Sequence, residues 1–69
     1  MGLINFVKKT VSEYNGAETA ERWIAFSDDE PTVEQVEAMA RERGEYDVDG
    51  FYDAFAHRWN RYIDKVEGK

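Results

Sequence analysis

The chain contains no cysteine, one proline and one histidine among 69 residues. Without cysteine it can form neither a disulfide framework nor a thiolate metal site. No apolar run approaches the roughly 20 residues of a membrane-spanning helix. The first residues, MGLINFVKK, become charged too early for a signal peptide. We therefore expect a soluble, unprocessed, cytoplasmic protein whose fold depends on its core alone.

The residues that are present indicate one compact domain over residues 1–69. The composition is 42% hydrophobic and 14% aromatic, which argues against disorder although 35% of the residues are charged. A chain of this length buries only about 60% of its unfolded surface. Large aromatic rings must therefore supply much of the core.

Apolar residues recur at helical spacing and predict an all-α bundle of about four helices, at residues 3–14, 17–26, 32–43 and 49–66. The Asn15-Gly16 pair predicts the end of the first helix; a hairpin turn at this pair is the alternative. The predicted buried arcs consist of Leu3, Ile4, Phe6, Val7, Val11 and Tyr14 in the first helix, Ala20, Trp23 and Ile24 in the second, Val33, Val36, Met39 and Ala40 in the third, and Phe51, Tyr52, Phe55, Trp59, Tyr62, Ile63 and Val66 in the fourth. Phe26, Tyr46 and Phe6 fall at the margins of these faces and could contact a partner.

Two short motifs mark the start of the third helix. Ser27-x-x-Glu30 and Thr32-x-x-Gln35 both match a capping box, in which each side chain satisfies an orphan backbone amide of the other residue. Within that helix, Glu37 and Arg41 are spaced for an ion pair.

The stretch EYDVDGFYDAFA resembles a calcium loop because acidic residues surround Gly50. In that alignment Ala56 takes the place of the bidentate glutamate, and there is no second loop. The alternative is that Asp47 or Asp49 caps the fourth helix. We favour the cap and predict no metal and no cofactor.

Nothing else in the sequence indicates catalysis. His57 has Asp53 one turn before it, which is also the spacing of an ordinary surface pair, and no serine stands in a nucleophile motif. The third and fourth helices could imitate a helix-turn-helix, but their connection is too long and the third helix is acidic. We predict a protein that is not an enzyme and does not bind nucleic acid directly.

Two short segments resemble known families, each over half the chain at most. Phe55-x-x-x-Trp59-x-x-Tyr62, after an acidic, proline-containing helix start, is similar to the end of small bacterial YozE-type proteins, which implies a SAM-like helical fold. ARERG followed by FYDAFAHRW resembles a stretch of ArdA antirestriction proteins, which imitate DNA. Neither resemblance assigns a role to a residue.

Charge is distributed unevenly along the chain, whose net charge is −6. Residues 17–47 contain ten acidic residues and three arginines, a net charge of −7. Such a block favours a basic partner over nucleic acid. The leading hypothesis is a non-enzymatic protein-binding module that acts as a DNA mimic, an anti-restriction or anti-CRISPR inhibitor of the phage or mobile-element type, on a larger basic nucleic-acid-binding protein. The predicted contact residues are Asp28, Asp29, Glu30, Glu34 and Glu37.

Two other interpretations remain open. The acidic residues could serve only to keep the surface hydrated and to favour a helix N-terminus. The protein could also be a SAM-like or homodimeric interaction module that pairs through its surplus aromatic residues, with incidental acidity. Ionic strength separates an electrostatic contact from an apolar one.

Overall fold

The protein is a crossed arrangement of helices, seen here in a computed structural model that describes residues 3–27 and 29–68, with side chains from residue 7 onward. These residues form α1 (Leu3–Phe26), α2 (Val33–Glu42) and α3 (Val48–Glu67), and no strand. The predicted all-α class is confirmed, with three helices in the described residues instead of about four. The molecule measures 42 × 23 × 16 Å along its principal axes.

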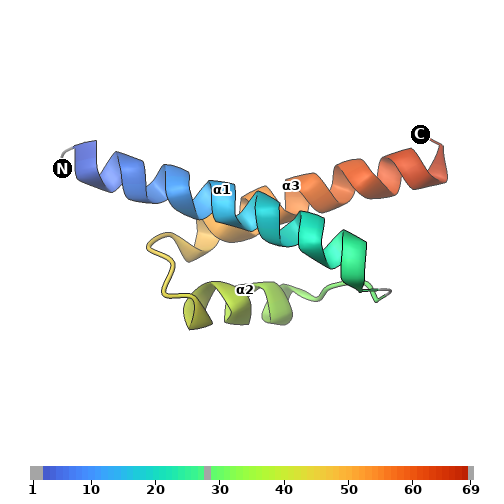
Figure 1. The fold of residues 1–69 in the computed structure, drawn as a ribbon, viewed down its shortest axis with the longest axis horizontal. Helices are drawn as coiled ribbons and strands as arrows, with labels where there is room; N and C mark the ends of the chain where they lie inside the picture. The colour runs from blue at the N-terminus through green and yellow to red at the C-terminus, as the bar shows by residue number, and fades with distance from the viewer. Residues whose placement is uncertain (1–2, 28, 69) are drawn as a thin grey trace.

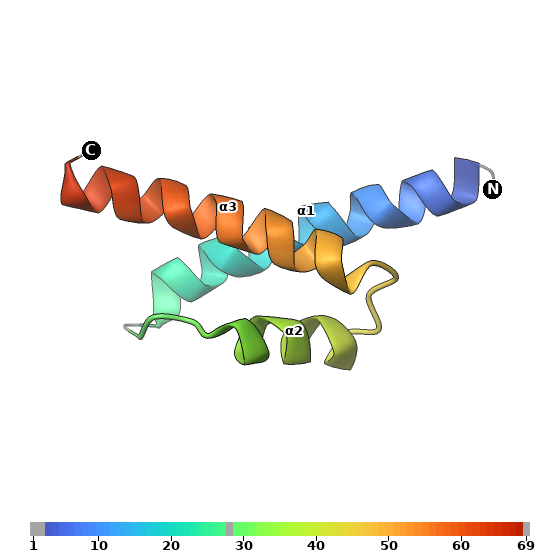
Figure 2. The ribbon, with the colours of Figure 1, turned by 180° about the vertical axis from the view of Figure 1, so that it is seen from behind.

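The two long helices cross, and each extends beyond the crossing in the opposite direction (Figure 1). α2 lies along one side of the crossing, as the view from behind also shows (Figure 2). α3 packs against both other helices. We call residues 3–14 the α1 arm and residues 59–67 the α3 arm; they lie at opposite ends of the long axis (Figure 1).

The predicted helix end at Asn15-Gly16 is wrong, because α1 runs through this pair without interruption. Gly16 is buried at the crossing, where an added Cβ would overlap the carbonyl oxygen of Phe51 and lie 3.0 Å from its Cα. Glycine therefore allows the backbone of α3 to approach α1 closely. Tertiary packing here outweighs the poor helix propensity of glycine.

The face of α1 that turns toward the other helices consists of small residues. Ser12, Gly16 and Ala20 follow one another at intervals of four residues, and all three are buried. Of these, the sequence pattern predicted only Ala20 as buried. We call these three residues the small-residue face.

The predicted buried arc of the first twelve helical residues is wrong wherever its side chains are described. Val7, Val11 and Tyr14 are 53%, 49% and 67% exposed. They lie on the side of α1 roughly opposite the small-residue face, because the two sets are offset by about half a helical turn. We call these three residues the apolar stripe; the side chains of Leu3, Ile4 and Phe6 lie outside the described residues.

The core lies where α3 meets α1 and α2. Phe51 and Phe55 of α3 are fully buried, and the ring of Phe55 meets that of Trp23 edge to face, with 6.3 Å between centroids. α2 contributes Val36 and Ala40, which are also buried. These positions confirm the predicted arcs of the later helices in part, because Ile24, Tyr62 and Ile63 are half-buried and lie outside this core. Three other predicted side chains, Met39, Tyr52 and Trp59, are partly buried against this core. Val33 and Val66, which were also predicted to be buried, are 48% and 63% exposed.

Local hydrogen bonds explain where α2 and α3 begin. Thr32 and Gln35 form the predicted capping box at the start of α2. The alternative box that starts at Ser27 does not begin a helix, since this residue continues hydrogen bonding from α1. Asp47 caps α3 by accepting a hydrogen bond from the amide of Gly50 at 3.0 Å. The predicted capping role of this loop is thus confirmed.

Candidate protein-binding surface

The segment between α1 and α2 is held by hydrogen bonds near both ends. The indole Nε1 of Trp23 donates to the backbone oxygen of Asp29 at 2.7 Å. At the other end, Thr32 and Gln35 form their capping box with distances of 2.9 and 3.1 Å. Asp29 and Glu30 are both exposed between these two anchors. The backbone next to their carboxylates is therefore tied by hydrogen bonds at Asp29 and at Thr32.

The first turns of α2 contribute the other predicted contact residues. Glu34 is exposed in the first turn, and Glu37 lies half-buried one turn later, where it pairs with Arg41 at 4.0 Å. Asp28 lies outside the described residues. Within the part of the chain that the structure describes, Asp29, Glu30 and Glu34 make no ion pair.

Much of the remaining acidic block is neutralised by internal ion pairs. Every arginine of residues 17–47 is used in this way, and α3 supplies a fourth. Besides Glu37, the paired acids are Glu18 with Arg22 at 2.7 Å, Glu21 with Arg58 at 3.4 Å and Glu45 with Arg43 at 3.1 Å. The uncompensated acidic surface is therefore smaller than the sequence predicts.

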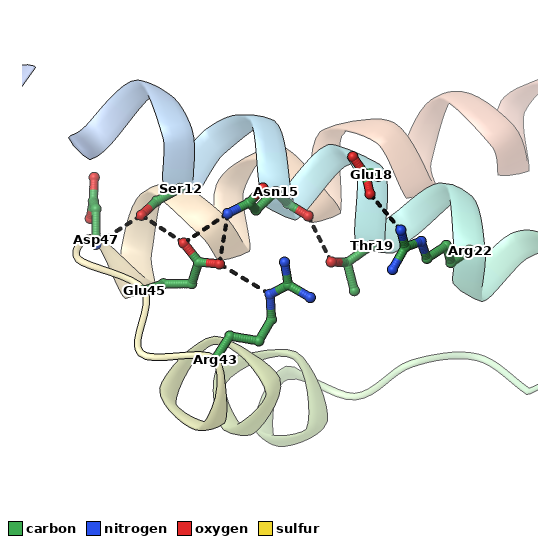
Figure 3. Close-up of polar contacts among 8 residues, drawn as sticks. All are labelled: Ser12, Asn15, Glu18, Thr19, Arg22, Arg43, Glu45 and Asp47. Carbon is green, nitrogen blue, oxygen red and sulfur yellow. Dashed lines mark hydrogen bonds and ion pairs between the residues drawn. The ribbon is translucent and has the colours of Figure 1, made fainter. Parts of the chain in front are cut away.

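Glu45 has a structural role that its place in the acidic block conceals. Its side chain is only 7% exposed and accepts hydrogen bonds from Ser12 Oγ at 3.1 Å and Asn15 Nδ2 at 2.9 and 3.2 Å (Figure 3). Arg43 Nε donates to it from the other side. Ser12 Oγ in turn accepts the backbone amide of Asp47 at 3.2 Å. This network ties α1 to the connection between α2 and α3, so Glu45 is not available to a partner.

The only histidine does not form an organised site in the described structure. His57 and Asp53 are both exposed, and no hydrogen bond or ion pair joins them. Among the described side chains, no three acidic or histidine residues gather closely enough to hold a metal ion. The geometry therefore gives no support to acid–base chemistry at this pair.

A second kind of surface is formed by exposed apolar side chains. Besides the apolar stripe, Phe26 is 86% and Tyr46 50% exposed, as their marginal positions predicted. Tyr46 lies beside the α1 arm, where the ammonium of Lys8 is 5.5 Å from the centre of its ring. Whether a partner covers these rings stays a prediction.

Comparison with known proteins adds no relative to this picture. No family model, curated protein or solved structure matches the chain. None of the helices in the described residues combines the length and apolar character needed to cross a membrane. The function must therefore be inferred from the surfaces themselves.

Proposed function

We propose that the protein is a non-enzymatic binding module that docks an acidic surface onto a larger, basic, nucleic-acid-binding protein. The contact centres on Asp29, Glu30 and Glu34, with Glu37 at its edge. One observation carries the proposal: these three carboxylates are exposed, lack internal counterions and stand on or beside a segment anchored by hydrogen bonds.

The physical basis is electrostatic complementarity. Carboxylates without internal partners attract a basic surface at long range and speed association with it. Because hydrogen bonds tie the backbone at Asp29 and at the start of α2, less conformational entropy is lost when these carboxylates dock. Fixed carboxylates can replace the phosphates that such a partner normally binds. This mode of action suits a DNA-mimic inhibitor of restriction or CRISPR machinery encoded by a phage or mobile element.

The proposal is tested by affinity capture on the immobilised chain, from a lysate of cells that encode it. Wild-type protein should retain a basic nucleic-acid-binding protein that is released by rising salt and by added duplex DNA. The triple variant Asp29→Asn, Glu30→Gln, Glu34→Gln should lose most of this retention, with at least a tenfold weaker affinity.

A matched control removes three negative charges elsewhere. Asp49, Asp53 and Asp64 are exposed on α3, so the triple Asp→Asn variant has the same net charge as the first. It should retain the partner with an affinity close to wild type. Equal losses in both variants would show that only net charge matters, and retention that survives high salt would show an apolar contact; either result contradicts the proposal.

The exposed rings and the apolar stripe favour a second candidate, a SAM-like or homodimeric module that associates through apolar surface. Its association should persist at ionic strengths that dissociate an electrostatic complex. The exposed rings and the apolar stripe do not include the acidic contact residues, so substitutions in each set test the two candidates separately.

A further inference from the structure

The α3 arm forms one side of a groove that is lined by both apolar and polar side chains, two of them acidic. The groove has a volume of about 510 Å³ and lies between this arm and the end of α1. Its charged lining residues are Glu30 and Glu67, both acidic. Its apolar lining is supplied by Ile24, Trp59, Tyr62, Ile63 and Val66.

The α1 arm has the opposite character. Its apolar stripe is exposed, and Lys8 lies next to this stripe on the helix. Residues 1–16 contain two lysines and a single acidic residue, which gives them a net charge of +1. An apolar helix stripe with a basic flank is complementary to the apolar side chains and the two glutamates of this groove.

The positions of the two surfaces allow two copies of the chain to form this contact twice. The arms project from opposite ends of the long axis (Figure 1, Figure 2). A two-fold rotation therefore brings the α1 arm of each copy to the α3 arm of the other, and closed two-fold dimers are the commonest oligomers.

We propose that a second copy of this chain covers the apolar stripe. The α1 arm of each copy packs into the groove of the other, with Lys8 directed toward Glu30 of the second copy. Two equivalent contacts form at once, so the total buried area is twice that of one contact and approaches the roughly 1,200 Å² of a specific interface. This inference specifies the second candidate function. It shares Glu30 with the acidic contact, but its test uses the purified chain alone, so each proposal can fail without the other.

A second copy fits the charges better than an anionic membrane surface does. The chain carries a net charge of −6, which opposes binding to anionic lipid, and only two lysines lie on the α1 arm. A copy of the chain instead supplies two glutamates next to apolar side chains.

The test is analytical ultracentrifugation of the purified chain over a range of concentrations. Wild type should show a monomer–dimer equilibrium that persists at high salt. Val11→Asp, Lys8→Glu and Glu30→Lys should each weaken dimerisation at least tenfold, because each places a charge in the apolar contact or like charges opposite one another. Circular dichroism should show each variant folded, since all three side chains are exposed.

Mixing the two charge variants gives the decisive result. In an equal mixture, Lys8→Glu faces Glu30→Lys in one contact, and the unchanged Lys8 faces the unchanged Glu30 in the other. Dimers should therefore return in the mixture although each variant alone is monomeric. Arg41→Glu, an exposed basic-to-acidic change on α2, is the control and should dimerise like wild type.

Three outcomes would overturn the proposal. The first is a wild-type chain that stays monomeric at millimolar concentration. The second is a mixture that remains monomeric, which would show that the dimer uses another face. The third is a monomeric chain that binds vesicles of phosphatidylserine and phosphatidylcholine through Val11, which would identify a lipid surface as the occupant.

Discussion

The two faces of α1 differ in burial, and the difference is the reverse of what their hydrophobicity alone predicts. The small-residue face includes a serine and a glycine and is buried, whereas the apolar stripe consists of two valines and a tyrosine and is about half exposed or more. The comparison shows that close approach of two backbones determines which face of this helix packs. The more hydrophobic face is left for another contact.

Polar groups on the buried face are satisfied where they pack. Ser12 Oγ donates to Glu45 and accepts from the amide of Asp47, so its burial leaves no hydroxyl without a partner. On the opposite face, the valines of the apolar stripe gain little from the fold of a single copy. This difference makes the small-residue face a determinant of stability and the apolar stripe a candidate interface.

The largest expected effect would break the close approach itself. In Gly16→Val the new side chain would meet the backbone of Phe51, which cannot rotate away as a side chain can. We expect a loss of about 3 kcal/mol in unfolding free energy, at the upper end of overpacking effects. For a domain of this size, the melting temperature should fall by roughly 12 °C or more, measured by circular dichroism.

The matched control for this substitution adds bulk to the exposed side of the same helix. Ala25 is exposed near the end of α1, so Ala25→Val should change the unfolding free energy by less than about 0.5 kcal/mol. If both variants lost the same stability, valine would be acting through helix propensity, and the proposed importance of the crossing would be wrong.

The next effect concerns the hydrogen bonds behind the small-residue face. Glu45→Ala removes the acceptor for Ser12, Asn15 and Arg43. It should lower the unfolding free energy by about 2 kcal/mol, measured by urea denaturation. Glu34→Ala removes an exposed carboxylate and should cost only a few tenths of a kcal/mol through the helix dipole. Similar costs for the two glutamates would contradict the structural role assigned to Glu45.

The buried residues of a helix could be predicted from the sequence only where the helix packs with its most apolar face toward the core. α2 and α3 pack in this way, so periodicity identified Val36, Phe51 and Phe55 correctly. Capping chemistry is local, and it correctly identified Thr32 and Asp47 as helix starts. The prediction fails for α1, which does not pack with its most apolar face. Gly16 is needed where α1 crosses α3, but in the sequence the Asn15-Gly16 pair is typical of a helix end.

The candidate site could be predicted only in part for a related reason. Charge counting identifies exposed acids such as Asp29 and Glu34, but it gives equal weight to Glu45, whose partners Ser12 and Asn15 lie some 30 residues earlier. Ion pairing across helices, as between Glu21 and Arg58, is likewise invisible in a linear sequence. The sequence therefore overestimated the free acidic surface while correctly predicting part of it.

The smallest expected effect sharpens the comparison on the exposed side. At concentrations where the chain is monomeric, Val11→Ser should change the unfolding free energy by less than about 0.5 kcal/mol, because Val11 is 49% exposed. The same substitution at Val36, which is 2% exposed, should cost roughly 2 kcal/mol or more through lost burial and an added hydroxyl.

Urea denaturation of wild type and Val11→Ser at higher protein concentration then shows whether the apolar stripe is an interface or stays exposed to solvent. Dimerisation stabilises the folded state by mass action, so wild type should gain stability as its concentration rises. Val11→Ser should gain less, because an exposed valine contributes only when a second copy covers it. A gain that is the same in both proteins would mean that the apolar stripe lies outside whatever contact the chain makes.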